Sequence, residues 1–171
     1  MVKILFMSIK PKYSHLIFEG SKRFELRRSS VKVARGDIVV VYASSPLKAV
    51  VGGFVVKDVI ASAPAKLWRE HGKSFGVTHG EYKKYFDGVG IGYAIEIDRK
   101  VSVNPISLEK LRRAHAEFKP PQSHMIWRNG LEALIGDEAA EKLLPEGIND
   151  DGNLPLFDFD AKGEESGLCR H

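Results

Sequence analysis

The sequence predicts an α+β fold: a small mixed β-barrel with short helices inserted between its strands and a helical, acidic C-terminal extension. Two observations support this prediction. About six short apolar, β-branched runs are separated by turn-forming Gly, Pro and Asp residues. The helical segments between them are short and irregularly placed, whereas a parallel-sheet nucleotide-binding fold needs regular β–α alternation.

The first two elements are predicted by hydrophobic pattern and by helix-end residues. Residues 4–9 (ILFMSI) form an apolar run that is typical of a strand. In the next segment, Pro11 suits the first position of a helix and Gly20 suits the residue just after its last turn. We therefore expect a short helix over residues 11–19.

Two strong strands follow in the middle of the chain. Residues 36–46 (GDIVVVYASSP) predict a strand that ends before its proline, and residues 47–63 predict a longer one. Adjacent glycines, Gly52 and Gly53, indicate a bulge or sharp coil, which a small barrel needs in order to close. Further elements are expected as helices from Pro64 to about Glu70 and within residues 78–88, and as a strand at residues 89–98.

Composition limits the class of protein. The chain has no apolar run of 18 residues, and its start lacks the small-residue cleavage site of a signal peptide. Its single cysteine, Cys169, cannot form an internal disulfide, and no Cys/His cluster has the spacing of a zinc site. We therefore expect a cytoplasmic protein that needs no membrane, metal or cofactor and is a monomer or weak dimer.

The charge is unevenly distributed along the chain. Residues 1–128 contain 23 Lys and Arg against 11 Asp and Glu, a net charge of +12. Residues 129–171 contain 3 against 11, a net charge of −8. We predict a basic domain over residues 1–128 and an acidic, partly helical extension over 129–171. A basic body favours an anionic partner, with nucleic acid first, although lysine-rich surfaces also serve solubility alone.

The most informative stretch is GSKRFELRR, residues 20–28. Phe24 and Leu26 alternate with charged residues, so they are expected to face the core and to leave the charged side chains together on the other face. A buried carboxylate at Glu25 needs a cationic partner, and a paired arginine keeps donors free for phosphate. These properties indicate an anion- or base-binding patch; a structural salt-bridge network is the alternative. Its members are Lys22, Arg23, Glu25 and Arg27.

The spacing Gly20-x-Lys22-x-x-Glu25-x-Arg27, after a strand ending in SIKP and a helix, resembles the signature of the ASCH domain family. The similarity covers about residues 1–105. It implies a PUA-like barrel whose cleft is lined by the signature residues and binds RNA or a nucleotide.

The same resemblance implies alternatives. Some family members hydrolyse the amide of an acetylated cytidine nucleoside or cleave RNA, and others act as protein-interaction modules in transcription coactivators. The amidohydrolases use the signature lysine, a threonine at the position of Glu25 and a later glutamate. Lys22, Glu25 and a later acid, Glu70 or Glu81, are the corresponding catalytic candidates. Glu25 departs from that pattern.

Several other residues are candidates for binding. Tyr42, Ser44 and Ser45 close a strong strand and could offer hydroxyl groups at the barrel mouth, although ASSP is also an ordinary turn sequence. Aromatic residues on the two middle helices would suit base stacking, but the i, i+3, i+4 spacing of Tyr82, Tyr85 and Phe86 favours core packing.

Three further segments have a less defined prediction. His71 and His79 flank a glycine-containing loop that could cover a cleft, and exposed loop histidines are the simpler interpretation. Residues 110–119 form either a second phosphate contact or a solvated helix face. The acidic extension could fold back on the basic body, through the segment NLPLFDFD (residues 153–160) among others.

Overall fold

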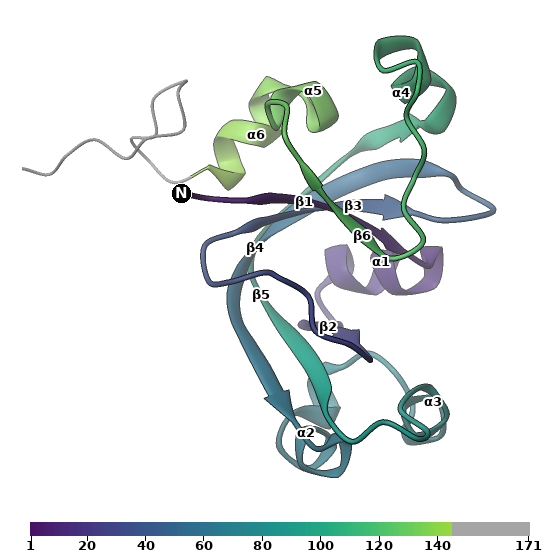
Figure 1. Ribbon diagram of the computed structural model, residues 1–171, viewed down its shortest axis with the longest axis vertical. Helices are drawn as coiled ribbons and strands as arrows, with labels where there is room; N and C mark the ends of the chain where they lie inside the picture. The colour runs from purple at the N-terminus through teal and green to yellow at the C-terminus, as the bar shows by residue number, and fades with distance from the viewer. Residues whose placement is uncertain (145–171) are drawn as a thin grey trace, which may run out of the picture.

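The computed structural model describes residues 1–144 and shows a curved, six-stranded mixed sheet with helices at both of its ends (Figure 1). The strand order is β2-β5-β4-β3-β1-β6, with β1 parallel to β3 and every other neighbouring pair antiparallel. The predicted fold class is confirmed, and the sheet forms an open half-barrel with β2 and β6 at its edges. The strands are β1 (Ile4–Ile9), β2 (Phe24–Arg27), β3 (Ile38–Ala43), β4 (Ala49–Ser62), β5 (Gly92–Ser107) and β6 (His124–Trp127).

The helices form two groups separated by the sheet. The first group comprises the helices within residues 64–85, which are inserted between β4 and β5 and lie at one end of these two long strands. The second group comprises the helices at residues 108–114 and 132–143 and lies at the other end (Figure 1). A further helix, α1, joins β1 to β2. The helices are α1 (Pro11–Glu19), α2 (Pro64–His71), the 3-10 turn η1 (Gly72–Ser74), α3 (His79–Tyr85), α4 (Leu108–Ala114), α5 (Glu132–Ile135) and α6 (Asp137–Leu143). Among the described residues, none of them is long and apolar enough to cross a membrane.

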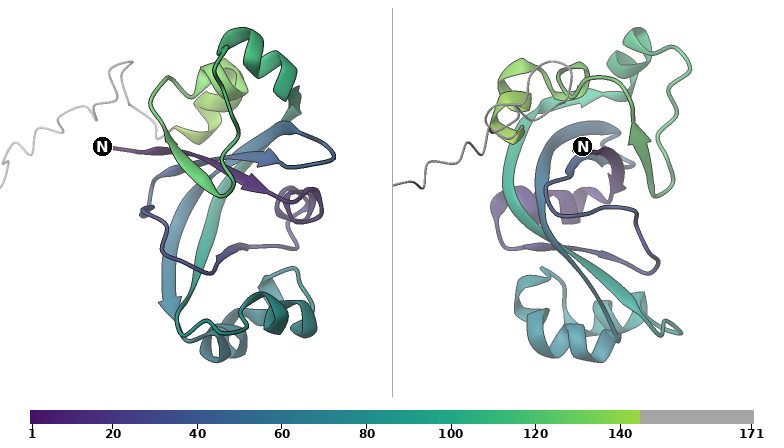
Figure 2. Two further views of the ribbon diagram at one scale, coloured as in Figure 1. Left: turned by 45° about the vertical axis from the view of Figure 1, so that its right-hand side comes forward. Right: turned by 60° about the vertical axis from the view of Figure 1, so that its left-hand side comes forward.

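Both faces of the central strands are buried, which explains their unbroken apolar sequences. On β3, Val39 and Val41 pack inside the curve of the sheet, whereas Val40 packs on the outer face with the second helix group. Figure 2 shows how β4 and β5 bend around β1 to produce these two sides. A third cluster joins β2 to the first helix group through Phe24, Leu26 and residues of α2 and α3.

The helix-end residues act as the sequence predicts. Pro11 occupies the start of α1, and Gly20 ends it in the left-handed conformation with φ of 110°. Thr78 and Glu81 form a reciprocal capping box at the start of α3. These caps fix the directions in which the chain enters and leaves the two helices that flank β2.

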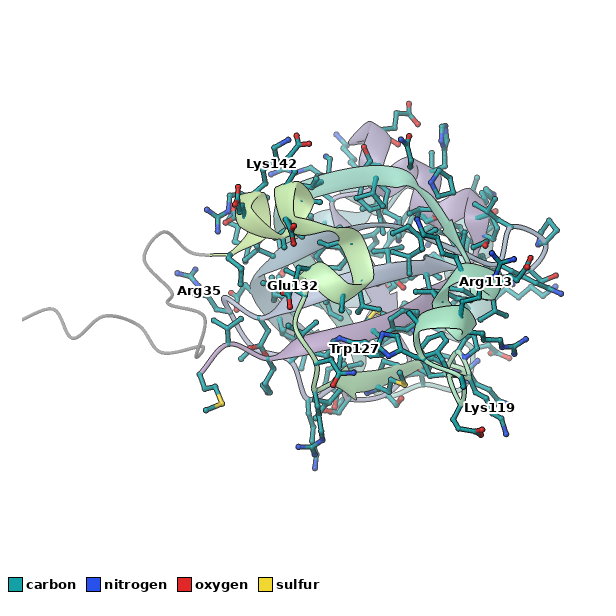
Figure 3. The ribbon with its side chains drawn as sticks, turned by 90° about the horizontal axis from the view of Figure 1, so that it is seen from above. Arg35, Arg113, Lys119, Trp127, Glu132 and Lys142 are labelled. Atoms are coloured by element: carbon teal, nitrogen blue, oxygen red, sulfur yellow. The ribbon has the colours of Figure 1, made fainter. Side chains whose placement is uncertain are left out.

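Two elements were not predicted. β6 has only four residues and follows two prolines, and it is specified by its pairing with β1 and by Trp127, which packs on Phe6. The second is α4: the sequence at residues 110–119 is compatible with either a phosphate contact or a solvated helix face and predicts no definite helix. Its Leu111 is buried, and Arg113 and Lys119 point outward at one end of the second helix group (Figure 3).

The described part of the acidic extension packs on the sheet. Leu131, Leu134 and Leu143 belong to the same hydrophobic cluster as Phe6 and Val40, so α5 and α6 cover the outer face of the half-barrel. The predicted fold-back of the acidic tail, with NLPLFDFD and Cys169, lies outside the described residues 1–144.

Gly52 allows the bend in β4 and provides a test of the fold. Its φ is 148°, and a Cβ there would lie 2.2 Å from the Val101 carbonyl oxygen and 2.7 Å from the Phe18 ring. We predict that Gly52→Ala lowers the free energy of unfolding by about 1–3 kcal/mol, measured by urea denaturation. The control is Gly80→Ala in α3, where the new methyl group has open space and should stabilise the helix by roughly 0.5–1 kcal/mol. Equal effects at both positions would contradict this account of the bend.

Candidate functional site

A cavity of about 370 Å³ lies between the sheet, α1 and α3, and the charged residues of β2 form its floor. Its volume is within the range of roughly 300–1,000 Å³ that is common for small-ligand sites. It collects residues from segments far apart in the sequence, and the mixture of buried charges and tyrosines makes it the strongest candidate site. The residues that line it are Ser8, Ile9, Lys10, Tyr13, Lys22, Glu25, Leu26, Arg27, Ser44, Val77, Glu81, Tyr82, Tyr85 and Gln122.

Lys22 is the most deeply buried charged residue of the cavity, with 3% of its surface exposed. Its Nζ donates to the backbone carbonyl of Phe75 at 3.0 Å, lies 3.8 Å from Glu25 Oε2 and sits 5.5 Å from the centre of the Tyr13 ring. Burial lowers the pKa of Lys22 below its ordinary value; Glu25 acts in the opposite direction and Arg27 adds to the lowering. Burial therefore outweighs the carboxylate, and the amine loses its proton more readily than a surface lysine.

Glu25 and Arg27 form the second part of the cavity floor. Glu25 is 6% exposed, and its Oε1 lies 3.0 Å from Arg27 Nη2. The same Nη2 donates to the Ser8 carbonyl oxygen at 3.3 Å. Within the described residues, Arg27 Nε is the one buried side-chain nitrogen or oxygen that has no hydrogen-bond partner. The guanidinium group is thus fixed by its neighbours and keeps an unused donor.

The guanidinium group also connects the cavity to β6. Arg27 Nη1 donates to Ser123 Oγ at 3.3 Å, and that oxygen lies 3.1 Å from His124 Nδ1. Burial lowers the pKa of His124, and the positive charge of Arg27 acts in the same direction. A chain of ion pairs and hydrogen bonds therefore runs from the buried lysine through Glu25 and Arg27 to the sheet edge.

Aromatic and acidic residues form the walls. Tyr85 is 39% exposed, and its hydroxyl donates to the Leu26 carbonyl oxygen at 3.1 Å, so its ring is held at the cavity edge. Glu81 bonds to Lys12 and to Thr78, and the hydrogen bond from Lys12 is the main reason that its pKa falls to about 2. This carboxylate is a fixed negative charge and not a proton donor at neutral pH.

The structure brings together only some of the predicted site residues. Lys22, Glu25, Arg27 and Ser44 line the cavity. Arg23 precedes β2 and is exposed, and Ser45 is exposed in the following turn; neither lines the cavity. Tyr42 is 3% exposed and packs against Phe6 on the outer face of the sheet, away from the cavity lining.

The two candidate acids occupy different places. Glu81 lines the cavity, whereas Glu70 lines a second, more open groove of about 1120 Å³ on the other side of the α3 start. The expected catalytic role of Glu70 therefore has no geometric support at Lys22. The structure places Glu81 in the first turn of α3, where its capping box with Thr78 holds it at the cavity wall.

Sequence reasoning missed the contribution of the start of α1 and of the segment before β6. Lys10 and Tyr13 line the cavity because α1 starts directly after β1. Gln122 lines it because β6 pairs with β1, and Ser123 contacts it only through its hydrogen bond from Arg27. A residue such as Ser123 lies 96 positions from Arg27, and no local pattern links them. Among the described residues, no group of three or more His, Cys, Asp or Glu could hold a metal ion.

The lowered pKa of Lys22 has a measurable effect on stability. Between its folded and unfolded pKa values, the unfolded chain binds more protons than the folded chain, so the free energy of unfolding rises with pH in that window. We predict that wild-type protein gains stability relative to Lys22→Met as pH rises from 7 towards 10, in urea titrations. Lys66→Met, which removes an exposed ammonium group from α2, is the matched control. A pH-independent difference for Lys22→Met would contradict the assignment.

Comparison with known proteins agrees with this architecture. The ASCH domain-containing ribonuclease of Zymomonas mobilis is 28% identical over 117 residues, which cover 68% of this chain and 79% of that protein. A crystal structure of ASCH from Zymomonas mobilis matches with a TM-score of 0.71 at 27% identity and covers 82% of this chain and 93% of that chain. The large ribosomal subunit protein uL22 of Ureaplasma parvum is 26% identical over 91 residues, 53% of this chain but only 29% of that protein. The ASCH domain model matches residues 7–112, more than half of the sequence, and this protein belongs to the ASCH domain family.

Proposed function

We propose that this protein binds single-stranded RNA and holds one nucleotide unit in the cavity above Lys22, Glu25 and Arg27. The observation that carries the proposal is a small-ligand-sized cavity whose floor is a largely buried, ion-paired group of two cations and one carboxylate. A related protein is described as a ribonuclease, which supports RNA as the partner. The +12 charge of residues 1–128 supplies long-range attraction for a polyanion.

Each part of the cavity suits one part of a nucleotide. Arg27 is held in place by Glu25 and Ser8, and its side chain, 12% exposed, presents a positively charged guanidinium group that suits a phosphate oxygen. Tyr85 offers a partly exposed ring on which a base can stack. Hydroxyl and amide groups at Ser44 and Gln122 add polar contacts for sugar or base edges. Because a base unit must be placed inside the cavity, an unpaired strand is the appropriate form of RNA.

The binding role of Arg27 is testable against its neighbour. We predict that Arg27→Gln weakens binding of a single-stranded RNA oligonucleotide about 10- to 100-fold, since it removes a charged hydrogen bond. Arg28→Gln removes the same charge from an exposed position, where Nη2 bonds to the Asp87 carbonyl oxygen, and should weaken binding less than threefold. Fluorescence anisotropy at two salt concentrations measures both. Equal losses for the two variants would show that charge alone, and not the cavity, binds RNA.

A second candidate function is RNA cleavage, and the position of Lys22 favours it. An amine with a lowered pKa is a suitable general base that takes the proton of the 2′-hydroxyl, whose oxygen then attacks the adjacent phosphorus. The P–O5′ bond breaks, a 2′,3′-cyclic phosphate forms, and the leaving 5′-oxygen of the next nucleotide takes a proton from water. The nearby Arg27 would stabilise the negative charge that develops on the phosphate oxygens. The ribonuclease relative gives this candidate support independent of the geometry.

The pH dependence of cleavage distinguishes a base from a binding residue. Because Glu25 raises the pKa of Lys22, we predict that Glu25→Gln moves the rising limb of the rate profile to lower pH. Cleavage of a fluorogenic RNA between pH 5 and 10 measures this shift. Lys22→Met should abolish turnover but leave RNA bound. If the rising limb of the rate profile stays at the same pH in Glu25→Gln, or if Lys22→Met keeps full activity, Lys22 is not the general base. If the wild-type protein leaves the RNA intact at every pH, the cleavage proposal fails and only the binding proposal stands.

A further inference from the structure

We propose that the groove beside the cavity is a second nucleotide subsite, in which an RNA base stacks on the Trp68–His79 pair. The inference rests on the proposed RNA-binding function and adds to it: the bound unit is then at least two successive nucleotides and not a single nucleoside. The groove has a volume of about 1120 Å³ and is formed by α2, η1, the start of α3 and Lys12 of α1.

The groove contains a rigid aromatic platform. The rings of Trp68 and His79 are stacked, with centroids 4.6 Å apart and planes 19° from parallel. Trp68 is supported from below by Tyr82 at 4.9 Å and by the backbone at Gly72, where an added Cβ would lie only 2.8 Å from the indole. His79 is exposed. An exposed ring on a fixed indole is the arrangement on which single-stranded nucleic acid bases stack without sequence preference.

The groove adjoins the cavity directly. Val77 and Glu81 line both spaces, and the Lys12–Glu81 ion pair stands between them. The loop that forms this wall is fixed to the cavity floor, since the Phe75 carbonyl oxygen accepts from Lys22 and an added Cβ at Gly76 would lie 2.8 Å from Lys22 Cβ. An RNA chain that leaves the cavity past Lys12 therefore enters the groove directly, because Val77 and Glu81 line both spaces.

The charges of the groove suit a phosphate next to a stacked base. Lys73 lies in η1 and is exposed, and Arg69 on α2 is exposed with its guanidinium 3.6 Å from Glu70. Within the described residues Lys73 has no ion-pair partner, and the Arg69–Glu70 pair is looser than the close Lys12–Glu81 pair. Lys73, with Arg69 beside it, is therefore the cation best placed to receive a phosphate from solvent. Glu70, which sequence analysis assigned to catalysis, then orients a phosphate-binding arginine.

The first test uses the complete wild-type chain and no substitution. Uridine 5′-monophosphate and a four-nucleotide 2′-O-methyl oligouridylate, which lacks the 2′-hydroxyl needed for cleavage, are titrated into ¹⁵N-labelled protein. The tetranucleotide is expected to bind at least about fivefold more tightly and to shift the Trp68 indole N–H resonance, with that of Trp127 unmoved. The mononucleotide is expected to shift neither. A Trp68 resonance that stays in place at saturating tetranucleotide would overturn the subsite.

A second test removes the platform. The double variant Trp68→Leu, His79→Ala should lose the fivefold advantage of the tetranucleotide and keep wild-type affinity for the mononucleotide. Lys84→Ala, an exposed residue of α3 that does not line the groove, is the control and should keep the advantage. If the tetranucleotide advantage survives the double variant while Arg27→Gln still weakens binding, the subsite is wrong and the cavity function stands. If neither probe binds to wild-type protein, both proposals fail.

Discussion

The arrangement of this ASCH domain around its cavity depends on the burial of one ammonium group. Lys22 reaches the interior because Gly20 ends α1 in a left-handed turn and directs the chain inward before β2 begins. A charge at 3% exposure is tolerated only with partners, and the Phe75 carbonyl oxygen and Glu25 provide them. The hydrogen bond from Lys22 to Phe75, together with the one from the Arg23 backbone N–H to the Ser74 carbonyl oxygen, also fixes the loop between η1 and α3. The cavity floor, its wall and the groove are therefore held at one place.

The fold was largely predictable because its signals are local. The apolar runs at β1, β3 and β4, the proline and glycine at the ends of α1, and the capping box of α3 are each specified within a few residues. β6 and the full length of β5 were missed because long-range pairing determines them: β6 is four residues long, and β5 continues past two register shifts against β4. Such pairing leaves little trace in a single sequence.

The same distinction between local and long-range signals applies to the candidate site. Glu25 and Arg27 alternate with Phe24 and Leu26, so one strand face predicts them together, and Lys22 joins them from the helix–strand junction. Arg23 shares the alternation but precedes β2 and does not line the cavity. The sequence predicts Tyr42 at the mouth of the cavity because it lies near the end of a strand. In a half-barrel buried on both faces, a strand residue can pack against either side, and Tyr42 packs on the outer one. Tyr13, Tyr85 and Gln122 join the cavity only through tertiary packing, which no motif records.

The carboxylate at position 25 bears on which chemistry the cavity can perform. Burial and Arg27 both lower the pKa of Lys22 and favour its neutral form, whereas Glu25 raises it. The threonine that the amidohydrolase members carry here has no negative charge, so it could not oppose burial in this way. Glu25 also holds Arg27, which a threonine could not do by ion pairing. Glu25 thus couples the proton affinity of Lys22 to the position of the Arg27 guanidinium group.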